Sequence, residues 1–486
     1  MSKKKQKTVE ELLDEALVPE EEQPYDVPAN WVWVSIGTLN NIVTGSTPSK
    51  KKDENYGGNF PFIKPTELGD EKNVRDGSEF LTNEGKEVSK IIPSESTLIC
   101  CIGSIGKVGF NNFECSTNQQ INSLVPKKEI LNPLFNYYQS ITPYFQNELI
   151  NRSYATTVSI INKSKMSMIP IPLPPINEQK RIANRVEELL DKVDQAKQLI
   201  EEAKETFELR RAAILDKAFR GELTAEWRRN NANLKPAMDC IEEAKAKQHV
   251  TKKQKEIMGD ELPFEIPDTW IWVRATEVAD VRDGTHDSPK YQSEGYPLIT
   301  SKNLKNGKLD FTNVNYISEA DHMNIGKRSK VDQGDILFAM IGTIGNPALI
   351  QEIHNAFSIK NVALFKPYEG IDNEYLAYYL ESSGYVQPLI NKAKGSTQKF
   401  VSLGKLRDSL IPIPPLDEQL EIKNSLKGLF EASNKSNALL EKLDSETIKQ
   451  SILSKAFRGE LGTNDPTEES AVELLKAVLQ DHQQEK

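Results

Sequence analysis

Apolar residues between positions 182 and 214 recur at alternating intervals of four and three, which is the a/d pattern of a heptad repeat. Charged residues fill most of the positions between them. The apolar positions are Ile182, Val186, Leu189, Val193, Ala196, Ile200, Ala203, Phe207 and Ile214. Only Arg210 breaks the pattern. A 3.5-residue period kept over so long a stretch favours a coiled-coil seam over a helix that lies on a globular core. At about 1.5 Å per residue, this helix would span roughly 50 Å.

A second and weaker seam lies near the end of the chain. Ser433 and Ser436 interrupt it. Its apolar positions are Ile422, Leu426, Leu429, Leu440 and Leu443. Two long helices in one chain, each following a globular stretch, most simply pack on each other. If the two stretches are related by a two-fold axis, the helices form an antiparallel coiled coil that separates the globular parts.

The sequence before the first seam has a different pattern of apolar and polar residues. Short β-rich runs at Trp31–Ile36, Thr97–Ile102 and Ile121–Val125 alternate with clusters of Gly, Asn, Pro and Ser. A more helical patch covers Leu134–Leu149. This mixture predicts an α/β globule that is rich in loops.

The chain repeats itself after about 240 residues. Lys217–Leu223 reads Lys-Ala-Phe-Arg-Gly-Glu-Leu, and the same seven residues return at Lys455–Leu461. The pattern Pro-x-x-Trp-x-Trp-Val begins at Pro28 and at Pro267, and Pro-Pro-x-x-Glu-Gln occurs before each seam. Solenoid repeats are only about 20 to 50 residues long, so this is a duplicated domain with its connector.

The fold class that follows is α+β, with two similar α/β domains separated by two long antiparallel helices in a pseudo-two-fold arrangement. We predict seven segments along the chain. They are a flexible tail (1–26) with one short helix around Val9–Leu17, a first module (27–173), a central long helix (174–224), a linker (225–262) with helical character at Met238–Lys247, a second module (263–413), a distal long helix (414–463) and an acidic tail (464–486).

Charge and cysteine content narrow the class of protein. The net charge is −10, but residues 1–26 and 464–486 carry −4 each, so the part between them is nearly neutral. This distribution argues modestly against indiscriminate DNA binding and leaves site-specific binding open. Four cysteines form no disulfide framework, and no apolar run is long enough for a membrane helix or a secretory signal. We therefore expect a cytoplasmic protein.

The sequence contains no recognisable catalytic constellation. A phosphate-binding P-loop and a metal-ligand spacing of Cys or His are both missing. Gly103 and Gly106 match Gly342 and Gly345 across the repeat, which indicates a turn that both modules need. We therefore predict a chain that is not an enzyme, with no catalytic residues and no metal ligands.

Paired polar loops are the chemistry that the repeat does carry. Gly- and Pro-containing loops at 44–52 and 283–290 combine hydroxyls with lysines, which are groups that contact phosphates and base edges. Polar loops are common on any surface, so the prediction depends on their pairing across the repeat. The predicted DNA-binding residues are Lys50, Lys51, Lys64, Thr66 and Thr157 in the first module and Lys290, Thr300, Ser301, Lys302, Gln398 and Lys399 in the second.

The combination of repeated motifs resembles the specificity subunit of type I restriction–modification systems over roughly residues 27–463. The resemblance implies two target-recognition domains that each read one half of a split DNA site, and a coiled coil that sets the spacing between the halves. It implies two methyltransferase subunits and endonuclease/translocase subunits as partners. S-adenosylmethionine, ATP and Mg would then be used by those partners, and this chain would carry no cofactor.

The duplicated heptapeptide suggests a structural role. We expect Phe219, Arg220, Phe457 and Arg458 to fix each long helix to the opposite module or to a partner subunit, since Phe and Arg are common anchors in interfaces. The alternative is that these residues only cap the helices, with Gly221 and Gly459 as stops.

Other functions remain open at this stage. The chain could serve a stand-alone modification system, act as a coiled-coil adaptor that binds protein, or be a fused methyltransferase–nuclease. Methyl transfer by the chain alone would indicate the enzyme. The absence of salt-dependent DNA affinity would indicate the adaptor.

Overall fold

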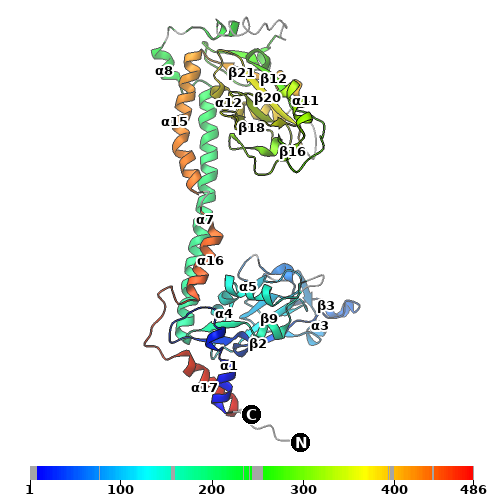
Figure 1. Cartoon of the computed structure of the whole chain (residues 1–486), viewed down its shortest axis with the longest axis vertical. Helices are drawn as coiled ribbons and strands as arrows, with labels where there is room; N and C mark the ends of the chain where they lie inside the picture. The colour runs from blue at the N-terminus through cyan, green and yellow to red at the C-terminus, as the bar shows by residue number, and fades with distance from the viewer. Residues whose placement is uncertain are drawn as a thin grey trace. The chain divides into compact units, whose positions relative to one another are not determined.

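The chain divides into two units whose boundaries cut across sequence order (Figure 1). Unit 1 contains Met1–Leu199 and Leu443–Lys486, and unit 2 contains Ile200–Lys442. Each module therefore shares a unit with the end of the helix that follows the other module. The computed structural model describes residues 8–69, 71–75, 77–154, 159–231, 233, 235–239, 241–242, 256–391, 393, 399–440 and 443–484.

The first module contains two four-stranded sheets and one two-stranded sheet. The first sheet is antiparallel and has the order β2 (Asn40–Thr44), β9 (Ile121–Pro126), β6 (Ser96–Cys100), β7 (Val108–Asn111). The second has the order β4 (Glu79–Leu81), β3 (Tyr56–Ile63), β8 (Cys115–Thr117), β5 (Ile91–Ile92), with β3 and β8 parallel. The short sheet pairs β1 (Val32–Ser35) with β10 (Pro170–Leu173). The three predicted β-rich runs are confirmed as β1, β6 and β9.

The predicted helical patch is two helices, α4 (Pro133–Ser140) and α5 (Pro143–Arg152). The side chain of Asn132 accepts a hydrogen bond from the Phe135 amide, and Thr142 does the same for Phe145. Each cap is followed by a proline at the first helical position, where its missing N–H costs nothing. The remaining helices of this module are α2 (Ile36–Leu39), α3 (Asn83–Glu87) and α6 (Lys163–Ser167).

The second module repeats this plan. Its sheets have the orders β12 (Ala279–Asp283), β20 (Val362–Pro367), β17 (Ile336–Ala339), β18 (Gly345–Leu349); then β16 (Asn315–Ile317), β13 (Tyr296–Ile299), β19 (Ser358–Ile359); then β11 (Ile271–Arg274) with β21 (Leu410–Ile413). Its helices are α10 (Ala275–Val278), α11 (Glu319–Ser329), α12 (Asn373–Glu381), α13 (Ser383–Asn391) and α14 (Leu403–Arg407). A hairpin of β14 (Leu304–Lys305) and β15 (Lys308–Leu309) distinguishes it from the first module.

One inner strand in each module, β6 in the first and β17 in the second, is buried on both faces and separates two cores. In β6, Ile99 packs with the cluster around α4, whereas Leu98 and Cys100 face a second cluster that includes Ile63. Strand β17 divides its side chains in the same way, with Phe338 on one face and Leu337 on the other. Because successive side chains of a strand point to opposite faces, a strand buried on both sides reads as a continuous apolar run.

The predicted central helix is confirmed as α7 (Ile176–Phe219), whose residues belong to unit 1 up to Leu199 and to unit 2 from Ile200. The predicted single distal helix is instead two helices, α15 (Leu416–Leu440) in unit 2 and α16 (Ser445–Ala456) in unit 1. Asp444 explains the second start, because its carboxylate accepts hydrogen bonds from the Glu446 amide and the Thr447 hydroxyl as an N-cap.

Within each unit the paired helices run antiparallel. In unit 1, Lys449 of α16 lies 2.5 Å from Asp194 of α7, and Asn464, after α16, donates to Glu178 near the start of α7. In unit 2, the Arg211 guanidinium of α7 stacks over Phe430 of α15, while Arg228 pairs with Glu418 at the start of α15. Residue numbers rise along α7 as they fall along its partners.

Burial along the predicted seams departs from a regular heptad. Ile182, Val186, Ile422 and Leu426 are buried. Leu189, Val193, Ile200, Phe207 and Leu440 are half-buried. Leu429 is 49% exposed while Phe430 is 3% exposed, so the prediction of Leu429 is wrong. The buried positions of α15 are Ile422, Leu426 and Phe430, which are four residues apart. Phe430 replaces Leu429 on the buried face, where it also contacts Tyr378 of α12. Leu443, which lies between α15 and α16 and is 55% exposed, is also not a seam residue.

The two predicted tails make defined contacts in unit 1. Helix α1 (Val9–Ala16) packs with α17 (Ala471–Gln484), and Leu13, Ala16, Ala471 and Leu475 are buried in the core of the first module. The expectation of a flexible tail is therefore wrong for residues 8–26. The short helix expected around Val9–Leu17 is confirmed as α1, and its apolar face is covered by the other end of the chain, which was not predicted.

The linker contains α8 (Ala225–Asn230) and helical residues at 237–239 and 241–242; the rest of the predicted Met238–Lys247 helix lies outside the described residues. Ile241 is fully buried. None of the described helices has the length and apolar character needed to cross a membrane.

Candidate nucleic-acid interface

The repeated motifs meet at one structural junction in each unit. In unit 1 the Trp31 indole N–H donates to Glu178 at 2.8 Å, and in unit 2 Trp270 donates to Glu418 at 2.9 Å. Both glutamates have no exposed surface. The Pro-x-x-Trp and Glu-Gln motifs are therefore two halves of one buried contact.

The glutamine after each glutamate connects the long helix to its module. The Gln179 amide oxygen accepts from the Asn132 backbone N–H at 2.8 Å, just before α4. Gln419 accepts in the same way from Asp372 at 2.9 Å, just before α12. Each glutamine therefore satisfies a backbone donor next to a helix start that would otherwise be buried without a partner.

Each heptapeptide docks on the module of the other copy. Phe219, which ends α7, packs on Tyr375 and Tyr379 of the second module, with ring centroids 5.5 and 5.0 Å apart. Phe457 packs on Phe135 of the first module at 4.9 Å. Both phenylalanines are buried, at 1% exposure, which leaves no exposed ring for a partner subunit.

The glycine of each heptapeptide also makes a close contact. Gly221 and Gly459 have φ values of +74° and +75°, and the following amide bonds back to Lys217 or Lys455, as in a Schellman cap. A Cβ at either glycine would lie 2.4 Å from a ring carbon of Pro267 or Pro28. The capping role and the docking role therefore coincide.

The arginines of the heptapeptides stack on aromatic rings of the opposite copy. Arg220 lies over Phe264 at 4.8 Å, and Arg458 lies over Tyr25 at 4.6 Å. The ring positions are 239 residues apart, so this contact also follows the repeat.

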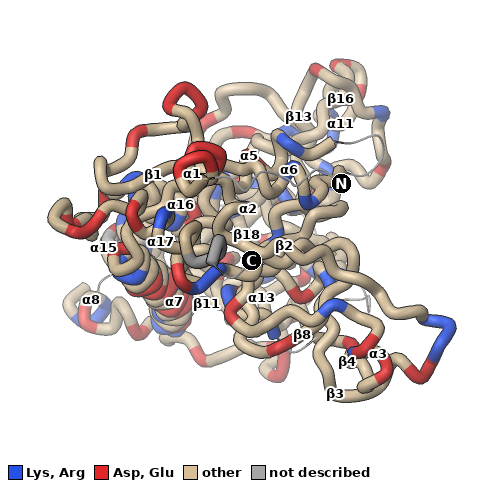
Figure 2. The backbone as a smooth tube through the Cα atoms, turned by 90° about the horizontal axis from the view of Figure 1, so that it is seen from below, with Lys and Arg blue, Asp and Glu red and all other residues tan. Residues whose placement is uncertain are grey.

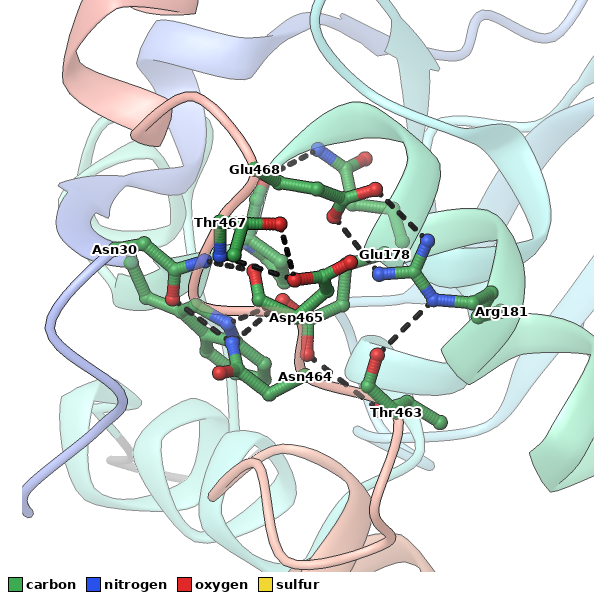
Figure 3. A network of polar contacts seen from close by, with 11 residues as sticks. Asn30, Glu178, Arg181, Thr463, Asn464, Asp465, Thr467 and Glu468 are labelled. Atoms are coloured by element: carbon green, nitrogen blue, oxygen red, sulfur yellow. Dashed lines mark hydrogen bonds and ion pairs between the residues drawn. The ribbon is translucent and has the colours of Figure 1, made fainter.

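The buried glutamates differ in what surrounds them. Figure 3 shows Glu178 accepting from Asn464 at 2.9 Å, while Arg181 beside it holds Glu468 through two hydrogen bonds. Both glutamates accept from a threonine hydroxyl, Glu178 from Thr463 at 3.5 Å and Glu418 from Thr224 at 2.7 Å. In place of the asparagine, Glu418 accepts from the Arg228 guanidinium at 2.9 Å. Burial raises the pKa of Glu178, and the hydrogen bonds from Trp31 and Asn464 offset this only in part.

In the first module, backbone hydrogen bonds join the residues that follow β2, the end of β3 and the residues between β8 and β9. We call this place the crossing, and the predicted DNA-binding loops 44–52 and 64–66 lie next to it in the sequence. After β2, the Gly45 amide bonds to Ile121 at 3.0 Å and the Ser46 amide to Thr117 at 2.9 Å. The Asn118 amide bonds to Ile63, the last residue of β3. A Cβ on Gly45 would lie 2.2 Å from the Asn118 carbonyl oxygen, so the close approach requires glycine.

The second module has the same crossing. The Gly284 amide bonds to Val362 at 2.9 Å, the Thr285 amide to Ile359 at 3.1 Å, and the Lys360 amide to Ile299 at 2.8 Å. In the first module, the loops after β2 and β3 are therefore held beside the link between β8 and β9. In the second module, the loops after β12 and β13 are held beside the link between β19 and β20.

Most predicted lysines of these loops are exposed. In Figure 2 a Lys/Arg-coloured stretch of backbone lies beside α3 and β4 of the first module. The exposed residues are Lys50, Lys51, Thr66, Lys290, Lys302 and Lys399. Lys64 is half-buried and pairs with Glu79 at 2.6 Å, so its charge is already balanced within the module.

The remaining predicted residues have other positions. The Thr300 hydroxyl donates to Asn303 at 2.9 Å, and the Ser301 hydroxyl donates to the Asn361 carbonyl at 3.4 Å. Thr157 and Gln398 lie outside the described residues. Among the described residues that follow them, Ser159 accepts from the Gly103 amide and Lys399 from the Gly342 amide. All four repeated glycines of these turns have positive φ, which confirms the predicted turn.

A set of polar side chains at each crossing was not predicted from the sequence. In the first module Thr47 contacts Gln119. In the second, His286 contacts both Asn361 and the buried carboxylate of Asp283, which also pairs with Arg328. The signal available was the polar stretch Ser116–Gln120 between two predicted strands, aligned with Lys360–Asn361 in the other copy. Among the described residues, no three His, Cys, Asp or Glu side chains gather as a metal ion requires.

Known proteins share this architecture. The type I restriction modification DNA specificity domain matches residues 28–205 and again 267–444. The chain is 26% identical over 455 residues to the EcoKI specificity subunit of Escherichia coli K12, covering 90% of both chains. It is 24% identical to the MjaVIII specificity subunit of Methanocaldococcus jannaschii, covering 90% of this chain and 94% of that one.

Two solved structures share the fold. One is the HsdS subunit from Thermoanaerobacter tengcongensis, with 19% identity and a TM-score of 0.53 over 90% of this chain and all of that one. The other comes from work on complex assembly and conformational transition of the type I restriction–modification system, with 21% identity and a TM-score of 0.61 over the same shares. With two matched specificity domains, the chain belongs to the type I restriction–modification DNA specificity family, the non-catalytic subunits that recognise the DNA target.

Proposed function

We propose that each module reads one half of a bipartite DNA site. The observation that carries this proposal is the strand crossing that recurs in both modules with different side chains. The backbone contacts of Gly45 and Gly284 are the same, whereas Thr47 and Gln119 of one module correspond to His286 and Asn361 of the other. A common frame with different polar groups suits two modules that bind the same polymer and read different sequences.

The lysines on these loops serve as phosphate contacts in this proposal. Lys50, Lys51, Lys290 and Lys302 are exposed on the loops that leave the crossings, and Lys399 is exposed beside the Gly342 turn. Phosphate contacts hold a protein in register but carry no sequence information directly. Lys64 takes a lesser part, because Glu79 already pairs with it.

The long helices set the separation of the half-sites in this proposal. α7 is one continuous helix of 44 residues, which corresponds to about 66 Å at 1.5 Å per residue. A matched deletion of one heptad from α7 and from its facing helix, around Asp194 and Lys449, should shorten the unread spacer by about three base pairs, since it removes about 10 Å.

Partner subunits complete the proposed function. Two methyltransferase subunits would dock on this chain, and endonuclease/translocase subunits would join the full complex. S-adenosylmethionine, ATP and Mg would be used by those subunits. The support is the likeness to chains named as specificity subunits of type I restriction enzymes. Exposed apolar side chains on α7, Leu199 and Leu209, offer contact area for such partners.

The test is the modified-base motif of cells that carry this chain with its methyltransferase. We expect a motif of two fixed halves around unread bases. Replacing residues 27–173 by the first module of a relative should change one half and leave the other half and the spacer intact. A motif without two separable halves, or a swap that alters both, would contradict the proposal.

A further inference from the structure

A side-chain amide occupies the same place at the crossing of both modules. Gln119 follows β8 and is exposed, one residue after the Asn118 amide that bonds to the end of β3. Asn361 follows β19, one residue after the Lys360 amide that bonds to the end of β13. The equivalence is therefore fixed by backbone hydrogen bonds and not by sequence identity.

Each amide is held through its oxygen. The Thr47 hydroxyl donates to the Gln119 amide oxygen at 2.5 Å. In the second module, His286 Nδ1 lies 2.8 Å from the Asn361 amide oxygen. Because His286 Nε2 faces the Asp283 carboxylate, both ring nitrogens donate only when the imidazole carries a hydrogen on each, as the imidazolium does. Thr47 and His286 themselves stand at the same place, two residues after Gly45 and Gly284.

The holding residue of the second module is braced from behind. His286 Nε2 lies 2.9 Å from the carboxylate of Asp283, whose side chain is 4% exposed. Arg328 pairs with the other oxygen of that carboxylate. Asn361 also has a φ of +55°, a left-handed conformation that Asn tolerates better than most residues. Several contacts thus fix the direction of one small side chain.

The opposite edge of each amide has no such partner. Among the described residues, the amide nitrogens of Gln119 and Asn361 donate to no protein acceptor, and Gln119 is exposed while Asn361 is half-buried. The NH₂ group of an amide donates two hydrogen bonds, and purine N7 and the O6 or O4 atoms accept them in the major groove.

We infer that Gln119 and Asn361 are base-reading residues, each of which donates from its amide to a base edge in the half-site of its own module. Thr47 and His286 are then positioning residues, which act by orienting the amide. This inference rests on the proposed function, because it names which groups within each module distinguish one base pair from another.

The test measures base preference with the full chain assembled with its methyltransferase subunits. Binding is determined to duplexes in which each position of both half-sites is varied in turn. We expect Gln119→Ala to lower the discrimination at one base pair of one half-site by on the order of ten-fold. Asn361→Gly, which keeps the positive φ accessible, should do so in the other half-site only.

Matched variants separate reading from general damage. Asn112→Ala and Asn324→Ala remove exposed amides away from the crossings and should change no preference. Lys50→Ala should weaken binding to all sequences alike. Thr47→Val should reduce the same preference as Gln119→Ala, and Thr47→Ser should restore it, because a serine hydroxyl can still donate to the amide oxygen.

The outcomes also separate this inference from the proposed function. If the unaltered chain shows two readable half-sites but Gln119→Ala and Asn361→Gly keep every base preference, the amides do not read bases. If both variants lose affinity equally for all sequences, the amides only support the loops, and the inference is again overturned. If the unaltered chain has no half-site preference, the proposed function itself fails.

Discussion

Unit 1 and unit 2 each enclose a glutamate at the start of a long helix, Glu178 in one and Glu418 in the other. Both accept a hydrogen bond from the tryptophan that opens the module. Glu418 is paired with the Arg228 guanidinium, whereas Glu178 meets the neutral amide of Asn464. The residue that approaches each glutamate comes from the chain just after a heptapeptide.

This difference separates what the junction needs from what it can vary. Both units retain the buried glutamate, the tryptophan, the glycine cap and the docked phenylalanine. The charge opposite the glutamate is not retained. A buried carboxylate with a cation is balanced, while one with only neutral donors keeps part of its desolvation cost. The two junctions should therefore respond differently to mutation and to pH.

The largest expected effect is the removal of a docked phenylalanine. Phe219→Ala and Phe457→Ala should each cost about 3–5 kcal/mol, because a buried aromatic ring leaves a cavity. Hydrogen exchange should rise in α12 for the first variant and in α4 for the second. Phe219→Leu and Phe457→Leu, which keep most of the volume, are the controls. Faster exchange in α4 for Phe219→Ala, or in α12 for Phe457→Ala, would contradict the docking of each heptapeptide on the module of the other copy.

Exchange of the glutamates for glutamine should distinguish the two junctions directly. Glu418→Gln leaves the Arg228 guanidinium, whose side chain is 18% exposed, without its carboxylate. We expect a loss of about 2–4 kcal/mol in the free energy of unfolding of unit 2. Glu178→Gln still offers an oxygen to Trp31 and buries no charge, so unit 1 should change by less than about 1 kcal/mol.

Urea unfolding with hydrogen exchange at β1 and β11 would measure both effects. The exposed Glu460→Gln is the control for a general loss of negative charge. Equal losses for Glu178→Gln and Glu418→Gln would mean that the charge opposite the glutamate has no energetic role.

The pH dependence should differ in the same direction. The pKa of Glu178 is raised by burial, so the folded state binds its proton more tightly than the unfolded state. Unit 1 should therefore lose stability as the pH rises from the ordinary glutamate pKa through the raised one. The Glu178→Gln variant lacks this titration.

The difference in melting temperature between the natural chain and Glu178→Gln, followed across the acidic range, isolates this one group. Other carboxylates behave oppositely; the hydrogen bond with Arg181, for example, lowers the pKa of Glu468. Because Glu468 is present in both proteins, its contribution largely cancels. A difference that does not vary with pH would show that Glu178 is not protonated more readily in the folded chain.

The same comparison explains how far sequence could lead. The duplicated motifs predicted two modules, the long helix α7 and a structural role for the heptapeptides in fixing the long helices. These predictions were possible because each motif is local and occurs twice. Motif spacing alone did not identify the Trp31–Glu178 contact, because its partners are 147 residues apart and pair only after folding. The charged first residues likewise gave no sign that α1 would be covered by α17.

The candidate site shows a similar limit. Sequence pointed to the lysine-bearing loops but not to Gln119 or Asn361, which lie next to short strands and reach those loops through backbone contacts. It also could not tell that Glu79 would pair with Lys64. Hydrophobic periodicity failed at Leu429 because α15 packs on a module as well as on a helix, and the module favours Phe430.

The smallest expected effect concerns the stacked arginines, where the two junctions should agree. Arg458 lies over Tyr25 and Arg220 over Phe264 at nearly equal distances. An exposed cation–π contact contributes about 0.5–1 kcal/mol, so Arg458→Ala and Arg220→Ala should cost similar amounts. Arg220 also pairs with Asp216 on the helix surface, which adds little. Double-mutant cycles with Tyr25→Leu and Phe264→Leu measure the stacking alone. Matching coupling energies would place the difference between the junctions at the buried glutamates, whereas unequal energies would mean that the arginines also distinguish the two units.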